Sequence, residues 1–176
     1  MITLPINSKR LRIRRFDAED LNAFCVYRSD PEVGRYQGWH PFSLEQARGF
    51  IAEHQTGSLG EPGRWFQLAV ALRESGAIIG DIGLCMVSED EAEVGFSFAR
   101  EAQGFGFATE AVRAVLQKLL GSGAVQSVRA ISDARNDRSM ALLVRLGFVL
   151  KHSYAEIFHG QWCEQQRFRL EAQDLK

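Results

Sequence analysis

A short glycine-containing segment, residues 103–109, combines residue types that can bind an anion. Its sequence is Gln-Gly-Phe-Gly-Phe-Ala-Thr, and apolar residues follow at helical spacing as far as Gly121. Glycine lets the backbone approach a ligand without obstruction by a Cβ atom. The first N–H groups of a helix lack intrahelical partners, and the helix dipole adds about half a positive charge there. The segment therefore predicts a site for phosphate oxygens, although two glycines can also serve only to make a tight strand-to-helix turn.

Three phosphate-binding motifs can be compared with this segment. A Walker P-loop requires Gly-Lys-Ser/Thr, which does not follow at the required spacing. A dinucleotide-binding fingerprint requires a small residue where Thr109 stands and an acidic residue about 20 residues further on, which is not evident. The pyrophosphate loop of acyl-CoA transferases has the pattern Q/R-x-x-G-x-G/A, and Gln103, Gly106 and Ala108 match each specified position. The segment therefore favours an acyl-CoA transferase.

Hydrophobic periodicity and capping signals predict the elements that position this loop. Asp17 and Ser43 stand where helix caps belong, and Ser43 begins a capping box. The Asp30-Pro31 step with Gly34 is expected to end the first helix. We therefore expect one mixed α/β (α+β) domain, residues 1–176, with a predominantly antiparallel sheet. Its predicted helices are 18–28, 44 to the loop at 57–63, 108–121 and 137–146, closed by Gly147, and its predicted strands are 10–14, 65–72, 77–87, 93–98, 125–132, 148–154 and 165–170.

The composition argues against several classes of protein. The chain has 176 residues and a formal charge of −1, so it lacks the basic excess that binds nucleic acid. No apolar run approaches the roughly 18 residues of a membrane span, and the N-terminus lacks the apolar core of a secretory signal, so we expect a cytoplasmic protein. Neither a disulfide framework nor a metal site is expected from the cysteines and histidines, which are Cys25, Cys85, Cys163, His40, His54, His152 and His159.

Several short motifs occur in the same order as in a known family. With the glycine loop they make the chain resemble the GNAT superfamily of N-acetyltransferases, and within it the branch of ribosomal-protein N-terminal acetyltransferases. The resemblance extends over residues 10–170. The motifs are Arg10-Leu11-x-Ile13-Arg14, Asp30-Pro31-Glu32-Val33, Ile79-Gly80-x-Ile82-Gly83, Glu93-Val94-Gly95-Phe96, Asn136-x-x-Ser139 and Leu146-Gly147-Phe148.

The resemblance implies a GNAT fold, flanked by helices, in which the sheet is splayed between strands 93–98 and 125–132. Acetyl-CoA, as co-substrate, would place its pantetheine arm in that opening. The Asn136 side chain would bond the arm and Ser139 would approach the thioester sulfur, although Asn136 can instead be a helix cap or turn residue. Further cofactor contacts are implied for the backbones of Phe98 and Ala99 on the arm, and of Gln103, Gly104, Phe105, Gly106, Phe107, Ala108 and Thr109 on the pyrophosphate.

Two departures from the family pattern bear on the mechanism. Many relatives carry a tyrosine as general acid where this chain has Leu143, so Ser139 is predicted to take that role, unless it only bonds within its own helix. The loop also lacks the basic residue that relatives carry at the position of Phe105. Phosphate charge would then rest on the backbone N–H groups, with Arg100, Arg135 or Arg138 as possible side-chain partners.

The remaining candidate residues concern the acceptor. Glu93 is predicted to be the general base, directly or through water, although it can also be a solvated acid at the end of a strand. By analogy, residues 36–40 would form the acceptor wall, with Tyr36 and Trp39 as substrate contacts. Aromatic residues at such positions are as often part of the core.

We thus predict transfer of an acetyl group from acetyl-CoA to a primary amine, by direct attack. A protein or peptide N-terminus is the preferred acceptor, because an α-amine with a pKa near ~7.7–8.0 is partly neutral at pH 7. An aminoglycoside, polyamine or amino acid remains an alternative acceptor, and the oligomeric state, monomer or homodimer, stays open. Two other classes are a hydrolase, suggested by the elbow-like sequence at residues 95–99, and a non-catalytic acyl-CoA sensor.

Overall fold

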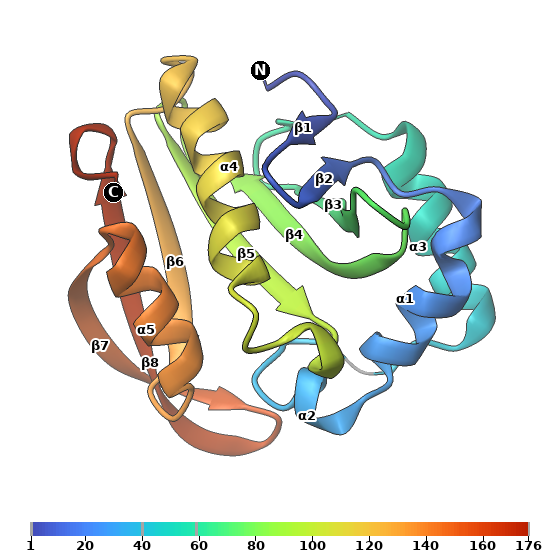
Figure 1. Ribbon diagram of the computed structural model, residues 1–176. Coiled ribbons are helices and arrows are strands. Elements are labelled where there is room, and N and C mark those ends of the chain that lie inside the picture. Colours follow the sequence, from blue (N-terminus) through green and yellow to red (C-terminus); the bar gives the residue numbers. More distant parts are fainter. Residues whose placement is uncertain (1, 40, 59, 176) are drawn as a thin grey trace.

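The computed structural model describes residues 2–39, 41–58 and 60–175. Eight strands form one sheet in the order β1-β2-β3-β4-β5-β6-β8-β7 (Figure 1). The strands are β1 (Ile6–Asn7), β2 (Leu11–Arg14), β3 (Trp65–Leu72), β4 (Ile78–Met86), β5 (Glu91–Phe98), β6 (Ser127–Asp133), β7 (Val149–Phe158) and β8 (Gln161–Glu171). The helices are η1 (Ala18–Asp20), α1 (Leu21–Arg28), α2 (Pro31–Gly34), α3 (Leu44–Thr56), η2 (Arg100–Ala102), α4 (Phe107–Gly121), α5 (Asp137–Leu146) and η3 (Ala172–Asp174).

The sheet is split between β5 and β6. These two strands run parallel, whereas the neighbouring strands elsewhere in the sheet run antiparallel. They pair only at Glu91–Ser127, Ala92–Val128 and Glu93–Arg129. Beyond Glu93 the strands separate, although each continues for several residues (Figure 1). The predicted mixed, mostly antiparallel and splayed sheet is therefore confirmed.

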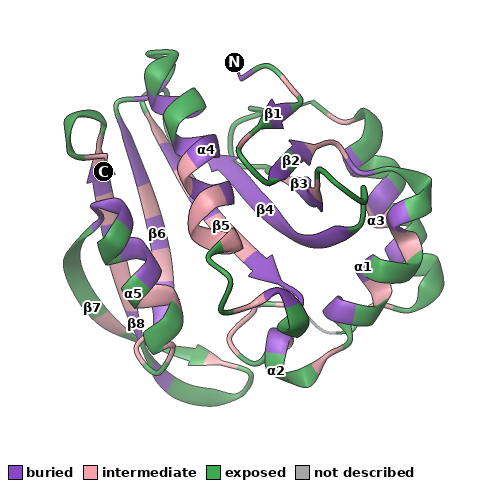
Figure 2. Cartoon of the chain, viewed as in Figure 1, coloured by how far each residue is buried: buried purple, intermediate pink, exposed green. Residues whose placement is uncertain are grey.

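Helices cover both faces of this sheet. Helix α4 packs against β1, β2 and β5, and α5 packs against β6 and α4 (Figure 1). Helix α1 packs against β4, and α3 against β3 and α1, on the other face. Figure 2 shows the resulting pattern, with buried residues along the central strands and an almost wholly exposed β7 at the sheet edge. In α4 the predicted apolar face is the buried one, with Val112, Val115 and Leu116 inaccessible to solvent.

A buried ion pair fastens α1 to β4. The Arg28 guanidinium lies 2.7 Å from the Asp81 carboxylate, and both side chains are at most 3% exposed. The Tyr27 hydroxyl donates to the same carboxylate over 2.6 Å. Burial, together with the negative charge of Asp81, raises the pKa of Tyr27 well above its usual value. The three side chains therefore satisfy one another inside the protein, where an unpaired charge would be costly.

Local signals explain the helix ends, with some corrections. The capping boxes at Asp17 and Ser43 are formed, and α5 has the predicted bounds, with Gly147 closing it at a φ of 99°. The helix before the Asp30-Pro31 step ends at Arg28, as predicted, but Pro31 also begins α2, which was not predicted and in which its missing N–H costs nothing. The predicted helix at residues 18–28 is divided into η1 and α1. Strand β1 was not predicted, and the β7–β8 hairpin is longer than expected.

Candidate active site

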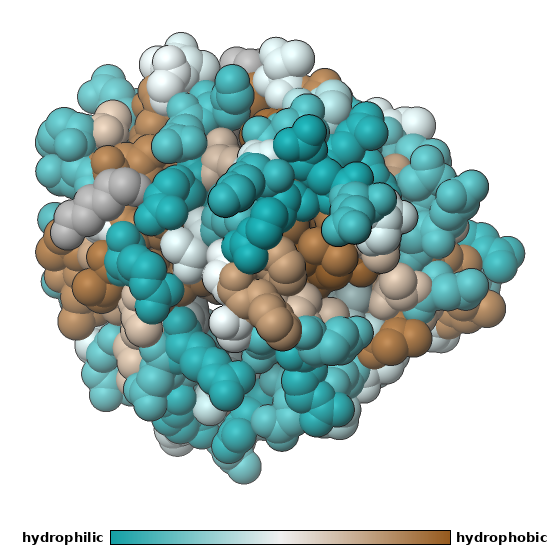
Figure 3. Space-filling model, in the orientation of Figure 1, coloured by the Kyte–Doolittle hydropathy of each residue, from teal (hydrophilic) through white to brown (hydrophobic). Residues whose placement is uncertain are grey.

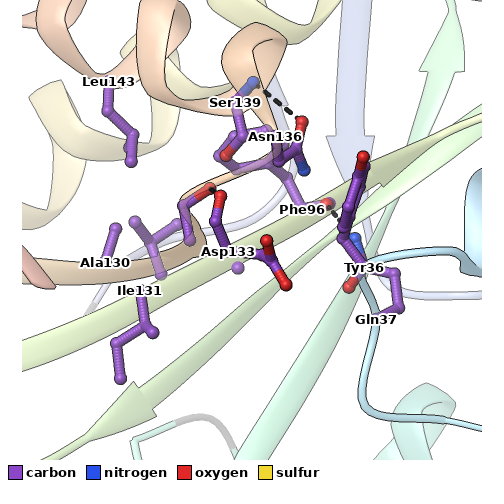
Figure 4. Close-up of a pocket in the computed structure, with 12 residues that line it drawn as sticks. Tyr36, Gln37, Phe96, Ala130, Ile131, Asp133, Asn136, Ser139 and Leu143 are labelled. Carbon is purple, nitrogen blue, oxygen red and sulfur yellow. Dashed lines mark hydrogen bonds between the residues drawn. The ribbon is translucent and has the colours of Figure 1, made fainter. Parts of the chain in front are cut away.

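A cleft occupies the gap between the diverging ends of β5 and β6 (Figure 4). The cavity volume of this cleft is only about 60 Å³, so it is narrow in the unliganded protein. The residues that line the cleft come from segments that are distant in the sequence. The lining residues are Tyr36, Gln37, Val94, Gly95, Phe96, Ala130, Ile131, Ser132, Asp133, Asn136, Ser139 and Leu143.

Two backbone carbonyls of β5 face this gap because β6 has moved away from them. The Phe96 carbonyl accepts a bond from Gln37 Nε2 over 3.3 Å, and the Phe98 carbonyl accepts one from Gln103 Nε2 over 3.0 Å. Ala99, in contrast, donates its N–H to the Ile79 carbonyl at β4 over 2.9 Å. Phe98 thus faces the gap as predicted, whereas the Ala99 N–H is turned away from it. The sequence analysis did not include Phe96. The Phe96 backbone faces the same side as that of Phe98, because every second residue of a strand directs its backbone groups to the same neighbouring strand.

The glycine loop presents a row of unused donors at the start of α4. Gly104 and Gly106 adopt the left-handed conformation, with φ values of 85° and 79°. Among the described residues, no acceptor bonds the N–H groups of residues 104–109, and the Glu110 N–H makes the first bond of the helix, to Gly106. The Gln103 N–H, predicted to belong to this row, donates to the Arg100 carbonyl over 3.1 Å. The loop is therefore arranged to bind an anion along residues 104–109.

Aromatic side chains accompany this loop at the surface. Figure 3 shows apolar side chains near the middle of the face on which α4 lies, ringed by hydrophilic ones. Phe105 is 64% exposed, and its ring lies 5.9 Å from that of Phe107, centre to centre. An anion held by the loop would thus have apolar groups beside it.

Arg10 is the arginine from a distant part of the chain that contacts this loop. Its Nη1 donates to the Phe105 carbonyl over 3.0 Å, and its guanidinium lies 4.3 Å from the centre of the Phe107 ring. The arginines considered from the sequence are otherwise engaged. Arg100 pairs with Asp30, Arg135 pairs with Asp133, and Arg138 donates to the Gln103 side chain. No local pattern could have pointed to Arg10, because it lies 95 residues before Phe105.

Glu110 holds Arg10 in this position. Its carboxylate accepts bonds from the Arg10 N–H over 2.7 Å, from Arg10 Nε over 2.7 Å and from the Ser8 hydroxyl over 2.8 Å. Burial alone would raise the pKa of Glu110, but the bonds from Arg10 and Ser8 outweigh it, so the pKa is lowered. Glu110 is therefore more stable as a carboxylate in the folded protein than in the unfolded chain.

We expect Glu110→Gln to destabilise the protein in a pH-dependent manner. A lowered carboxyl pKa adds stability above the usual value of 4.5, and this contribution is lost as the pH falls through the folded-state pKa. At pH 7 the variant should lose about 1–2 kcal/mol of unfolding free energy in urea titrations. The difference from the natural protein should shrink below about pH 4. Glu101→Gln, at an exposed position, is the control, and a pH-independent difference would contradict the assignment.

Asn136 and Ser139 lie at the start of α5, on the cleft (Figure 4). Asn136 is the helix cap, and its Oδ1 accepts a bond from the Ser139 N–H over 3.2 Å. Capping uses only the amide oxygen, so the NH₂ group remains a donor toward the cleft. Among the described residues, the Ser139 hydroxyl has no hydrogen-bond partner, so it does not bond back to its helix. Leu143, one turn further on, is buried and presents only an apolar side chain.

Glu93 lies beside the cleft but does not line it. Its Oε2 accepts from Arg129 Nε over 2.8 Å, and Arg129 Nη2 lies 2.7 Å from the same oxygen. The carboxylate is therefore part of an ion pair and is not a solvated strand-end acid. It can accept a proton only at the expense of that pair.

The two predicted acceptor contacts have different surroundings. Tyr36 lines the cleft, and its hydroxyl donates to the Arg135 carbonyl over 3.3 Å. Trp39 packs against the hydrophobic core, and the Arg28 guanidinium lies 3.6 Å from its ring centre. Of the predicted wall at residues 36–40, His40 lies outside the described residues. The structure therefore brings Tyr36 to the site and places Trp39 behind it.

The hydrolase elbow that the sequence suggested at residues 95–99 lacks a structural basis. Ser97 is buried within β5, and the strand continues to Phe98, so the sharp strand-to-helix turn of a hydrolase elbow is not formed there. In the described part of the chain, no group of three or more His, Cys, Asp or Glu residues is placed to hold a metal ion. Nor is any described helix long and apolar enough to cross a membrane.

Comparisons with known proteins agree with this geometry. A family model described as acetyltransferase (GNAT) domain matches residues 10–149. The uncharacterized N-acetyltransferase p20 of Bacillus licheniformis is 31% identical over 144 residues, which is 80% of each chain. A ribosomal L7/L12 α-N-protein acetyltransferase in complex with coenzyme A is 18% identical, with a TM-score of 0.80 and coverage of 96% of this chain and 98% of that one. A Vibrio cholerae spermidine N-acetyltransferase in complex with CoA and spermine is also 18% identical, with a TM-score of 0.80 and coverage of 95% and 98%.

Proposed function

Because this chain belongs to the GNAT family of acetyltransferases, we propose that it transfers the acetyl group of acetyl-CoA to the α-amine of a protein or peptide. The observation that carries the proposal is the row of unused N–H groups at residues 104–109, at the start of α4 and close to the open edge of β5. A diphosphate needs several hydrogen-bond donors that point to the same place. The row of N–H groups offers such donors, and no charged side chain has to lose its water to provide them. The gap between β5 and β6 then offers a path for a thin, extended arm.

In this proposal, several residues have separate roles along the cofactor. The N–H groups of residues 104–109 hold the diphosphate, and Arg10 keeps the loop in place through the Phe105 carbonyl. The backbones of Phe96 and Phe98 offer hydrogen bonds to the amides of the pantetheine arm, as a neighbouring strand would. The amide NH₂ of Asn136 donates to the same arm. The acetyl group then lies near Ser139, at the first turn of α5.

The proposed reaction is a direct attack within a complex of both substrates. The neutral amine attacks the thioester carbonyl, a tetrahedral oxyanion forms, and the carbon–sulfur bond breaks to release the CoA thiolate. Ser139 donates its hydroxyl proton to the departing sulfur and regains one from water, because Leu143 cannot do so. The amine loses its proton to water or, through water, to Glu93, and an α-amine needs less help than a lysine amine because its pKa is about 2 units lower.

The acidic content of the cleft favours an α-amine over a polyamine. The spermidine acetyltransferase above binds spermine, which carries several positive charges. Among the described residues that line the cleft, Asp133 is the only acidic one, and Arg135 Nη2 neutralises it at 2.7 Å. The hydrogen bond from Arg135 lowers the pKa of Asp133, against the effect of burial. No free carboxylate is thus left among the described lining residues to attract a polycation.

The test is a screen of amines with the purified protein and acetyl-CoA. The panel contains peptides with free N-termini, the same peptides blocked at the N-terminus, spermidine, an aminoglycoside and free amino acids. We expect thiol release and an acetyl mass shift with the free peptides, and neither with the blocked peptides, spermidine or the aminoglycoside. Tight binding of acetyl-CoA in calorimetry with no amine-dependent thiol release would instead indicate a sensor domain and would overturn the proposal.

Two substitutions of Asn136 separate its capping role from its cofactor role. Asn136→Ala should weaken acetyl-CoA binding and also cost about 1 kcal/mol of stability, because the helix cap is lost. Asn136→Asp keeps a capping oxygen but removes the NH₂ donor, so it should retain the thermal midpoint and still weaken binding about 10-fold. Calorimetry and thermal denaturation measure the two effects. If Asn136→Asp bound acetyl-CoA normally, Asn136 would be a cap only.

A further inference from the structure

One face of β6 and β8 beside the cleft is only partly covered. Along β6, Val128 and Ala130 are buried while Arg129 and Ile131 are partly exposed, and β8 shows the same alternation over residues 167–171. Figure 4 shows that Ile131 points away from α5, which carries Asn136 and Ser139. Ile131 lines the cleft, so this partly covered face meets the site at that residue. An acceptor that enters from the side opposite to α5 would pass over it.

Three carboxylates on this face are already neutralised. Arg129 Nη2 lies 2.7 Å from Glu93. Arg169 Nη1 lies 3.1 Å from Glu91, and its Nε lies 2.8 Å from Glu171. Two arginines thus account for all three acidic groups.

Arg167 lies two residues before Arg169 on β8, and among the described residues it has no anionic partner. It pairs directly with Ile131 across β6 and β8, and with His152 across β7 and β8. In the described part of the chain it makes neither an ion pair nor a hydrogen bond, and its Nε is buried without a partner. Among the described residues, its guanidinium carbon lies 5.6 Å from the centre of the Tyr154 ring. A half-buried guanidinium without an anion is unfavourable, and a planar fork of this kind binds carboxylates in a bidentate manner.

We propose that Arg167 binds a carboxylate of the acceptor and thereby selects acceptors that carry a negative charge close to the reacting amine. This inference rests on the proposed function. Adjacent strands lie about 4.8 Å apart, so Arg167 is one strand away from the cleft wall at Ile131. An extended peptide advances about 3.5 Å per residue. The carboxylate is therefore that of an acidic side chain at the second or third residue of a peptide, or that of a free amino acid.

The experiment compares acceptors that differ only in charge. Matched peptides carry Asp, Asn or Lys at the second position and, in a parallel set, at the third, and free serine and aspartate form a separate arm. We expect kcat/KM of the natural protein to favour Asp over Asn by about 10–100-fold, mainly through KM. If the acetylation of free amino acids depends on Arg167 and the peptides show no preference for Asp, the bound group is the α-carboxylate of an amino acid. If only the peptides favour Asp over Asn, it is the carboxylate of the side chain.

Variants of Arg167 test the assignment itself. Arg167→Met should reduce the Asp-to-Asn ratio to about 1, and Arg167→Glu should reverse the preference toward the Lys peptides. Arg48→Met, an exposed position on α3, should retain the preference of the natural protein. Thermal denaturation establishes that each variant is folded, and the Met variant carries the test if the Glu variant is not.

The outcomes are distinguishable. Acetylation of the peptides with no charge preference, or with a preference that Arg167→Glu leaves unchanged, would overturn this inference alone. If no peptide or amino acid were acetylated, the proposed function would fail first, and the inference would fall with it.

Discussion

Replacing Ser139 with alanine is expected to lower kcat by about 10²-fold or more, at unchanged affinity for acetyl-CoA. General acids contribute about 10²–10⁴-fold to the rate. Leu143 stands where relatives carry a tyrosine as general acid, so we assign this role to the Ser139 hydroxyl, which lines the cleft close to the cap of α5. The Ser139 hydroxyl makes no bond within the described residues, so its removal should cost little stability. Steady-state kinetics with a peptide acceptor, together with calorimetry for acetyl-CoA, measure the two effects.

Two controls make this result specific. Ser139→Thr keeps a hydroxyl and should recover part of the rate. Ser122→Ala removes a hydroxyl at the other end of α4, where Ser122 donates to the Leu119 carbonyl, and should leave kcat unchanged. An unchanged kcat in Ser139→Ala would exclude Ser139 from the mechanism and leave water as the proton donor.

The largest stability effect is expected at the buried cluster of Tyr27, Arg28 and Asp81. Asp81→Ala should cost about 3–5 kcal/mol of unfolding free energy, because it leaves the Arg28 guanidinium buried without an anion. Equilibrium urea unfolding measures the loss. Because Arg28 also stacks on Trp39, the variant should raise KM for the acceptor more than it changes affinity for acetyl-CoA.

A combined replacement tests the cause of that loss. Tyr27→Phe/Arg28→Met/Asp81→Leu removes all three polar groups together, and such apolar replacements are often neutral or stabilising. It should therefore be much more stable than Asp81→Ala. Glu53→Ala, which breaks an exposed pair with Arg64, should barely move the urea midpoint. If the triple variant were as unstable as Asp81→Ala, cavity formation and not the buried charge would explain the loss.

Elements with strong local signals could be predicted from the sequence. Both capping boxes and the bounds of α5 follow from residues within one helical turn. The end of α1 before the Asp30-Pro31 step was predicted, but α2 was not, because the same step can both end one helix and begin the next. The outer half of β7 was missed because this strand is exposed along nearly its whole length, so its sequence shows no buried face.

The candidate site was predictable only where it is continuous in sequence. The glycine loop and the Asn136–Ser139 pair each lie in one short segment. The contacts of Arg10 with the loop and of Arg28 with Asp81 join distant segments, and no spacing rule encodes them. A signal did exist for the second contact, since a lone acidic residue in the apolar run of β4 requires a buried partner.

The glutamine amides on the edge of β5 have an energetic consequence. Gln37 and Gln103 occupy the carbonyls of Phe96 and Phe98 in the unliganded protein. A pantetheine amide that takes either carbonyl replaces an existing bond, so the exchange is nearly neutral in enthalpy and serves alignment more than affinity. The net driving force then falls on the diphosphate end, and the dissociation constant for acetyl-CoA should rise steeply with ionic strength.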